Sequence, residues 1–113
     1  MSLPIQPLTD DVSVAPQLTP EAMTEVASAG YRSVINNRPD FEGGPAQPTS
    51  ASIEAAALAA GLTYAWLPVA SNFQSPDDIG RFAALLDSMP KPILAFCRSG
   101  TRSGNLLRGA LAL

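Results

Sequence analysis

The stretch "ILAFCRSGTRSGNLL", residues 93–107, decides the fold of this chain. It opens with an apolar run at 93–96, passes through a turn that contains Gly100, and enters an expected helix near Thr101. A short, continuous apolar run is typical of a strand that is buried on both faces of a parallel sheet. Cys97, the only cysteine of the chain, stands where this run meets the turn. A thiol used only for packing would lie within the run, whereas a strand end is where parallel-sheet proteins bind their ligands.

Elsewhere the sequence alternates between strand and helix patterns. Each expected helix carries a start signal, the clearest being Ser75 and Asp78, which form a capping box. Strands that alternate with amphipathic helices imply parallel pairing and right-handed crossovers. The sequence therefore predicts one α/β domain, residues 1–113, with a mostly parallel central sheet flanked by helices. Further strands are expected at 11–15, 31–35 and 63–69, and helices from the Thr19 cap to Gly30, from Thr49 or Ser50 to Gly61, and between Ser75 and Pro90.

The composition argues against several classes of protein. The chain has 113 residues, a net charge of −3 and only seven lysines and arginines, so we expect no nucleic-acid-binding surface. No apolar run approaches the roughly 20 residues that span a bilayer, so we expect no membrane segment. The first residues lack the basic start and the apolar middle of a signal peptide. A single cysteine cannot form an internal disulfide, which fits a reducing compartment, and we expect a cytoplasmic protein.

The absence of histidine narrows the chemistry further. Without histidine, a metal site built from thiolates and imidazoles is almost excluded, and so are Ser-His-Asp and Cys-His nucleophile pairs. We expect no metal and no other cofactor. A cysteine nucleophile that is activated by its own loop is one of the few catalytic options that remain.

Three segments should meet at the carboxyl edge of the sheet, namely residues 36–40, 68–74 and 97–103. In the last of them a strand leads into a helix N-terminus, whose backbone N–H groups and dipole favour a bound anion. Gly100 lets the backbone curl closely round a bound group, and Arg102 offers a planar fork for an oxyanion. A thiol in such a cradle should have a lowered pKa and supply a thiolate at neutral pH.

The expected roles follow from this loop. Cys97 is the expected catalytic nucleophile, and Arg102 is expected to bind the anionic end of the substrate. Ser103 either supports the thiolate or acts as a local cap partner, and Arg98 either steers anions or is simply exposed. Alternatively, Cys97 only ends a core strand and both arginines are solvated. The substrate-binding backbone is expected to run from Arg98 through Ser99, Gly100 and Thr101 to Arg102.

The loop "CRSGTRS", residues 97–103, resembles the active-site loop of single-domain rhodaneses and a shortened phosphate loop of cysteine-based protein phosphatases. Along its length, the chain is similar to the bacterial beta-lactamase hydrolase-like, phosphatase-like domain family. This resemblance implies a dual-specificity-phosphatase-type fold and either phosphatase or sulfur-transfer activity. It is carried by "LTDDVSVAPQLTPE", "GYRSVINNRPDFEG", "QPTSASIEAAALAAGLTYAWLPV" and "PILAFCRSGTRSGNLL".

The spacing in the loop favours sulfur transfer. Four residues separate Cys97 from Arg102, whereas the phosphatase pattern has five. Phe96 stands where phosphatases of this kind have a histidine, and residues 68–74 hold no aspartate to serve as general acid. The first prediction is therefore a rhodanese-type sulfurtransferase that forms a persulfide on Cys97. The alternatives are a cysteine-dependent phosphatase that uses Cys97 and Arg102, and a non-catalytic module that binds phosphate or a partner.

The segment "NNRPD", residues 36–40, is the candidate second wall of the site. Asn37, Arg38 and Asp40 put polar groups at a strand end that faces the same crevice, and Asp40 is the remaining candidate for an acid in a phosphatase. Alternatively, the segment is a turn that Pro39 bends, in which Asn and Asp side chains bond their own backbone. The sequence leaves both interpretations open.

The expected ligand is a small anionic substrate, either a sulfane-sulfur donor or a phosphate ester. The family resemblance also implies a metallo-hydrolase partner, fused or separate. The last residues, 105–113, are apolar and end without glycine, proline or a basic last turn. Either the chain is shortened and its helix continues, or the apolar face of the helix completes the core or a dimer contact.

Overall fold

The computed structural model describes residues 3–113 and has a five-stranded sheet in the order β1-β2-β5-β3-β4. The central strand β5 (Ile93–Phe96) pairs in parallel with β2 (Val12–Ala15) and β3 (Ser33–Asn36). Strand β4 (Thr63–Trp66) extends the sheet in parallel beyond β3, and β1 (Gln6–Pro7) pairs antiparallel with β2. All four residues of β5 are buried, as the apolar run predicts.

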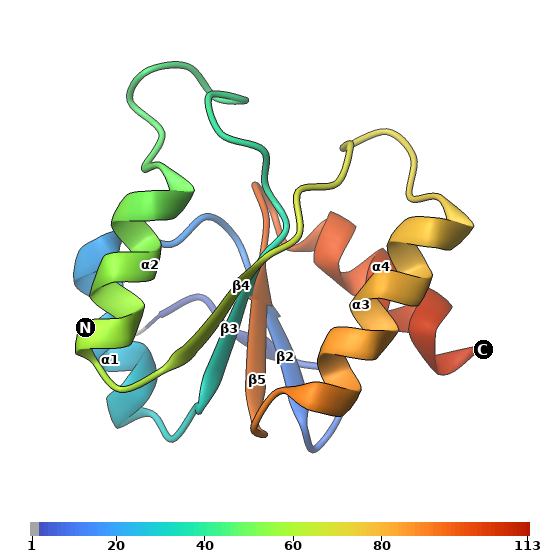
Figure 1. Ribbon diagram of the computed structural model, residues 1–113, viewed down its shortest axis with the longest axis horizontal. Helices are drawn as coiled ribbons and strands as arrows, with labels where there is room; N and C mark the ends of the chain where they lie inside the picture. Colours follow the sequence, from blue (N-terminus) through green and yellow to red (C-terminus); the bar gives the residue numbers. More distant parts are fainter. Residues whose placement is uncertain (1–2) are drawn as a thin grey trace.

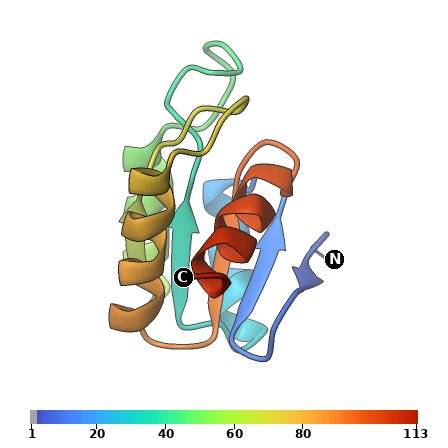
Figure 2. The same ribbon diagram turned by 90° about the vertical axis from the view of Figure 1, so that its right-hand side faces the viewer.

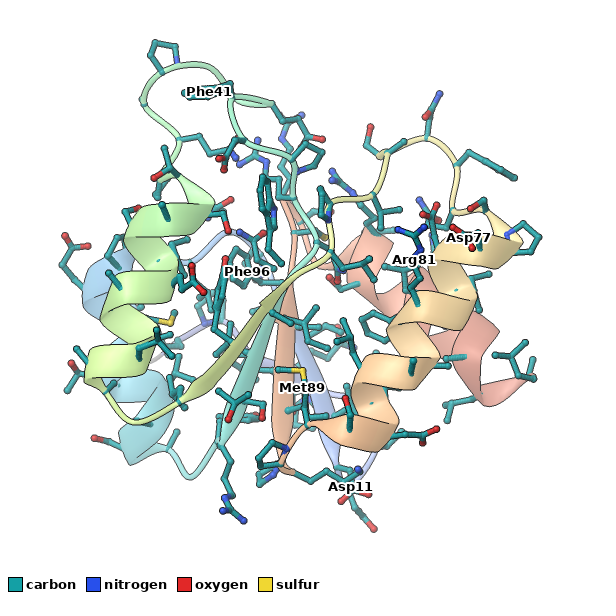
Figure 3. All side chains as sticks on the ribbon, viewed as in Figure 1. Asp11, Phe41, Asp77, Arg81, Met89 and Phe96 are labelled. Carbon is teal, nitrogen blue, oxygen red and sulfur yellow. The ribbon has the colours of Figure 1, made fainter. Side chains whose placement is uncertain are left out.

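Helices cover both faces of this sheet (Figure 1). The 3₁₀ helix η1 (Pro20–Ala22), α1 (Met23–Ser28) and α2 (Ser50–Ala59) lie on one face, and α3 (Pro76–Ser88) and α4 (Thr101–Leu111) lie on the other. The view turned by 90° shows α3 and α4 side by side (Figure 2). The sheet therefore separates two apolar clusters, and Figure 3 places Phe96 in one of them and Met89 in the other.

The α/β class, the parallel central strands and the flanking helices are confirmed, and the differences are local. The helix expected from Thr19 to Gly30 begins as η1, capped by Thr19, and continues as the short α1. The strand expected at 63–69 ends at Trp66, although the Leu67 and Val69 N–H groups still donate to the Asn36 and Asn37 carbonyls at 2.9 and 3.1 Å as the chain leaves the sheet. Strand β1 was not predicted, since two residues carry no periodic signal.

Helices α3 and α4 are held close together. The predicted capping box starts α3, since Ser75 Oγ accepts from the Asp78 backbone N–H at 3.0 Å and Asp78 Oδ2 accepts from the Ser75 N–H at 2.9 Å. Gly109 of α4 lies against Ile79, and a Cβ at this position would come within 2.7 Å of Ile79 Cδ1. The small residue therefore lets the two helix axes approach, which fixes the helix that follows the cysteine loop.

The last helix packs its apolar face on the sheet. Leu106 and Leu107 are buried, which agrees with the interpretation that this face completes the core. Leu111 and Leu113 are 64% and 81% exposed at the end of the chain. Among residues 3–113, no helix combines the length and the apolar character that crossing a membrane requires.

Candidate active site

The loop that joins β5 to α4 lies at the carboxyl edge of the sheet, as do the loops that follow β3 and β4 (Figure 1). Gly100 has a φ of +94°, which L side chains rarely adopt, and it is the N-cap of α4. A Cβ on Gly100 would also lie 3.5 Å from the Ala15 carbonyl carbon on β2. The glycine therefore serves both the left-handed turn and the tight approach of the loop to β2.

Cys97 is buried at the base of this loop, with 1% of its surface exposed. The backbone N–H of Gly100 donates to Cys97 Sγ at 3.1 Å. Burial acts to raise the pKa of the thiol, but hydrogen bonds from Ser103, Gly100 and Ser99 outweigh it, so the pKa of Cys97 lies below its ordinary value. The thiol is thus buried like a core residue, yet the loop stabilises its thiolate form.

Ser103 contacts both the thiol and Asn37: its backbone N–H points to Cys97 and its side chain bonds Asn37. Its hydroxyl donates to Asn37 Oδ1 at 2.9 Å, and this hydroxyl has a single proton to give. Because the hydroxyl directs this proton at Asn37, the thiolate is stabilised by the backbone N–H groups of Ser103, Gly100 and Ser99. Asn37 is fully buried and donates through Nδ2 to the Leu67 carbonyl at 3.1 Å. The structure therefore places Asn37 beneath the site, where it orients Ser103, and not on an open wall.

Arg102 is buried beside the loop, with 5% of its surface exposed. Its Nη1 donates to the backbone carbonyls of Val69 at 3.0 Å and Asn37 at 3.3 Å, and its Nη2 donates to Glu42 Oε1 at 3.0 Å. Nε is the nitrogen of this guanidinium that is buried and has no hydrogen-bond partner among the described residues. A buried guanidinium N–H without a partner is costly, which makes Nε the candidate donor for a bound anion.

Arg38 reaches the same place from the loop after β3. Its Nε donates to Glu42 Oε1 at 2.8 Å and its Nη1 donates to Gln17 Oε1 at 3.1 Å, so one carboxylate oxygen of Glu42 serves both Arg38 and Arg102. Burial acts to raise the pKa of Glu42, but the hydrogen bonds and charges of the two arginines lower it to a value below its usual range. Glu42 is therefore ionised at neutral pH.

Sequence reasoning did not find Glu42. The residue lies in an irregular loop with no periodic pattern, and its partner Arg102 is distant in sequence. Its neighbour Phe41 has a φ of +64° and is 67% exposed, and Figure 3 shows it at the outer end of the loop. A non-glycine residue in the left-handed region is strained, and such residues cluster near functional sites. The conformation of Phe41 therefore marks this turn in the structure, but it cannot be read from the amino-acid sequence.

The two remaining polar residues of this segment, Asn36 and Asp40, accept hydrogen bonds from backbone N–H groups. Asp40 Oδ1 accepts from the Ser50 backbone N–H at 2.8 Å, at the first turn of α2. Asn36 Oδ1 accepts from the Arg38 backbone N–H at 2.9 Å. The Asn36 contact fits the alternative interpretation, in which side chains of this turn bond its own backbone, whereas Asp40 bonds a different element. Of the segment 36–40, Arg38 is the residue that the structure brings to the cavity.

A cavity of about 460 Å³ lies beside the cysteine loop; Arg98 and Arg102 of the loop line it, the buried Cys97 does not, and Ser71 supplies the contribution of the loop after β4. Residues 68–74 contain no carboxylate, and the aspartates that follow are engaged on α3: Asp77 pairs with Arg81 at 3.0 Å and Asp78 belongs to the capping box. Figure 3 shows Asp77 and Arg81 together on that helix. The cavity is lined by Arg38, Glu42, Gly43, Ser71, Arg98 and Arg102.

Ser99 and Thr101 lie on the outer rim of the loop and are exposed. Ser99 Oγ accepts from the Thr101 backbone N–H at 3.4 Å and donates to Thr101 Oγ1 at 3.2 Å. A second hollow, of about 180 Å³, lies on this side of the loop against β1 and β2, but neither Arg102 nor Arg38 lines it. The two hydroxyls therefore hold the shape of the loop, and the arginine-lined cavity is the candidate active site.

Comparisons with known proteins agree with this architecture. The model of the family described as "Beta-lactamase hydrolase-like protein, phosphatase-like domain" matches residues 4–112. The beta-lactamase hydrolase-like protein of Xylella fastidiosa is 34% identical over 96 residues, and that of Agrobacterium fabrum is 31% identical over the same length. In each case the match covers 85% of this chain but 22% of the relative, so the chain spans about a fifth of the length of these relatives.

Two solved structures share the fold. A candidate phosphatase from Neisseria meningitidis superposes with a TM-score of 0.86 at 33% identity, covering 94% of this chain and 75% of that protein. TpbA of P. aeruginosa, solved in complex with pTyr, has a TM-score of 0.68 at 11% identity, covering 92% of this chain and 59% of that protein. The second likeness is one of fold alone.

Proposed function

Since the chain belongs to the family of the beta-lactamase hydrolase-like protein, phosphatase-like domain, we propose that it is a cysteine-dependent phosphatase that hydrolyses phosphate monoesters. The observation that carries this proposal is the buried, unpartnered Nε of Arg102, held beside a cysteine whose pKa is lowered. The family and the N. meningitidis neighbour support a phosphatase over the sulfurtransferase that the loop spacing alone favours.

The reaction proceeds in two displacements. The Cys97 thiolate attacks phosphorus, an S–P bond forms, and the P–O bond to the leaving group breaks. Arg102 Nε and the N–H groups of the loop bind the non-bridging oxygens, where negative charge is held through the transition state. Water then attacks the phosphocysteine, the S–P bond breaks, and inorganic phosphate leaves as the thiolate is restored. The proton that the attacking water loses passes to solvent.

The leaving group receives its proton from water. Residues 68–74 contain no acid, and Glu42, the one carboxylate that lines the cavity, has a lowered pKa and is ionised at neutral pH. A positioned acid typically contributes about 10²–10⁴-fold, and its absence matters least for leaving groups that are stable as anions. The enzyme should therefore hydrolyse aryl phosphates much faster than alkyl phosphates.

Hydrolysis of 4-nitrophenyl phosphate tests the proposal. We expect turnover by the wild type, loss of turnover in Cys97→Ser, and a loss of at least about tenfold in Arg102→Lys, because lysine lacks the Nε donor of the guanidinium. Arg32→Lys is the matched control, since Arg32 is exposed just before β3, at the opposite edge of the sheet. Phosphocysteine trapped by rapid acid quench should map to Cys97. A wild-type rate no higher than that of Cys97→Ser would overturn the proposal.

Sulfur transfer is the second candidate, and the four-residue spacing between Cys97 and Arg102 supports it. In this reaction the thiolate attacks the outer sulfur of thiosulfate and the S–S bond of thiosulfate breaks. Sulfite is the leaving group, and Cys97 carries the transferred sulfur as a persulfide. Cyanide then takes the outer sulfur as thiocyanate and restores the thiolate. Intact-mass measurement after thiosulfate treatment discriminates the two. A one-sulfur adduct that needs Cys97 and that cyanide discharges, without aryl phosphate turnover, would replace phosphatase by sulfurtransferase.

A further inference from the structure

Positive charge is concentrated over the cavity although the chain is acidic. The net charge is −3 and there are only seven lysines and arginines, yet Arg38, Arg98 and Arg102 all line this one cavity. Glu42 is the single acidic residue in the lining, so one carboxylate faces three guanidiniums. A cleft lined by one sign of charge focuses its field on ligands of the opposite sign.

The side chain of Arg38 is held in one position by hydrogen bonds and burial. Gln17 accepts from its Nη1, Glu42 accepts from its Nε, and the side chain is 9% exposed. Gly43 packs against the third nitrogen of this guanidinium, since a Cβ at Gly43 would lie 2.6 Å from Arg38 Nη2. A guanidinium that is held this firmly is pre-organised to bind an oxyanion.

The carboxylate of Glu42 shows where Arg38 can bind an oxyanion. Its Oε1 lies between Arg38 and Arg102, and its side chain is 24% exposed, so a ligand can reach it from the cavity. In the free protein an oxyanion of the chain itself thus occupies the space between the two arginines. An incoming oxyanion has the same chemistry and competes for the same donors.

Arg98 adds a further cation at the rim. It is exposed, it lines the cavity, and no carboxylate of residues 3–113 lies within ion-pair distance of it. In the proposed reaction a single phosphate group needs only Arg102 Nε and the N–H groups of the loop. Arg38 and Arg98 are therefore more than one phosphate group requires, and the cavity of about 460 Å³ is far larger than such a group.

We infer that the substrate carries a second anionic group, which Arg38 and Arg98 bind while Arg102 and the cysteine loop bind the reacting phosphate. This inference rests on the proposed phosphatase reaction and names its substrate class: a phosphate monoester with a second phosphate or carboxylate group close to the first. The second group takes the Arg38 Nε donor that Glu42 otherwise holds, and Arg98 adds its own donors.

Calorimetric titration with two non-hydrolysable ligands tests the inference on the intact, reduced chain. Methylphosphonate carries one anionic group, and methylenediphosphonate carries two. We expect the wild type to bind methylenediphosphonate at least about tenfold more tightly, because the second group meets its own arginines. Arg98→Gln should reduce this preference to about twofold and change methylphosphonate affinity little. Arg32→Gln removes the same charge at the opposite edge of the sheet and should keep the preference.

Arg38 is tested by two routes, since its buried side chain also supports the loop. Arg38→Gln removes the charge, whereas Gly43→Ala keeps the charge and forces the guanidinium to move. Both should lower the preference for methylenediphosphonate. A wild type that binds the two ligands equally, or that binds neither, overturns the inference, and so does an equal loss of preference in Arg98→Gln and Arg32→Gln. Preference for methylenediphosphonate without aryl phosphate turnover would instead overturn the phosphatase and leave the two-anion site standing.

Discussion

Glu42 Oε1 accepts a hydrogen bond from Arg102 Nη2 at 3.0 Å, although the two residues lie 60 positions apart in the chain. The contact ties the loop after β3 to the first turn of α4, and the same oxygen also accepts from Arg38 at 2.8 Å. The outer edge of the Arg102 guanidinium is therefore occupied by a carboxylate, while its Nε remains without a partner among the described residues. The carboxylate of Glu42 thus lies against the same guanidinium whose Nε lacks a partner.

Replacing Glu42 with glutamine should tighten anion binding. The substitution removes a negative charge next to the bound oxyanion and weakens the hydrogen bonds that hold Arg38 and Arg102, so we expect the affinity for inorganic phosphate to rise by about threefold to tenfold. Calorimetric titration at low ionic strength measures the change. Glu21→Gln, at an exposed position of η1, is the matched control and should leave the affinity unchanged. A weaker affinity in Glu42→Gln would instead mean that Glu42 acts mainly by positioning Arg102.

The lowered pKa of Cys97 should depend on the conformation of Gly100. Thiolate forms as the pH rises through the pKa, so the ultraviolet absorbance of the thiolate should appear at a lower pH than in an unstructured cysteine peptide. Gly100→Ala strains a residue whose φ is +94° and displaces the N–H that donates to Cys97 Sγ, so the midpoint should shift to higher pH. Gly61→Ala is the matched control, because Gly61 has a φ of +83° and open space around it. Equal midpoints in the two variants would contradict the role of the Gly100 N–H.

Asn37 should matter more for stability than its polar character suggests. Asn37→Ala leaves the Ser103 hydroxyl and the Leu67 carbonyl without their partners in a fully buried place. We expect a loss of about 2–4 kcal/mol in the free energy of unfolding, since each buried group left unpaired costs roughly 1–3 kcal/mol. Urea denaturation measures it against Asn72→Ala, in the exposed loop after β4. If the two variants are equally stable, the buried hydrogen bonds of Asn37 contribute little.

Asp40 is expected to act on α2 rather than on the substrate. Asp40→Ala removes the acceptor of the Ser50 N–H and should cost about 1 kcal/mol of stability, as the loss of a helix cap does. Asp40→Asn keeps an oxygen acceptor and should retain most of that stability. Thermal unfolding compares the two variants. A fall in aryl phosphate turnover that is equally large in both variants, with the stability of Asp40→Asn preserved, would return Asp40 to the role of an acid.

The parts of the fold that depend on local pattern could be predicted from the sequence. The apolar run 93–96, Gly100 and the capping box of Ser75 each act within a few residues, so the strand, the loop and the start of α3 lie where the pattern put them. The opposite holds for Glu42, whose role arises from a contact with Arg102 across the chain.

Burial decided the remaining cases. From the sequence alone, the polar residues at the end of a strand cannot be told apart by the direction of their side chains. In the structure the pleat of the strand and the turn that follows orient each side chain differently. Asn37 turns under the cysteine loop, Arg38 turns into the cavity, and Asp40 reaches the start of α2. Which residue takes which direction depends on the packing of α2 and α4, and the segment itself does not contain that information.

The antiparallel strand β1 has a consequence for the behaviour of the folded chain in concentrated solution. Strand β2 is apolar and would otherwise present an open row of backbone donors and acceptors to other copies. Strand β1 covers that row with two exposed residues, of which Pro7 has no N–H to offer to an incoming strand. The sheet is thereby closed on this side by a strand too short and too poor in donors to template further pairing, which protects the protein against edge-to-edge aggregation.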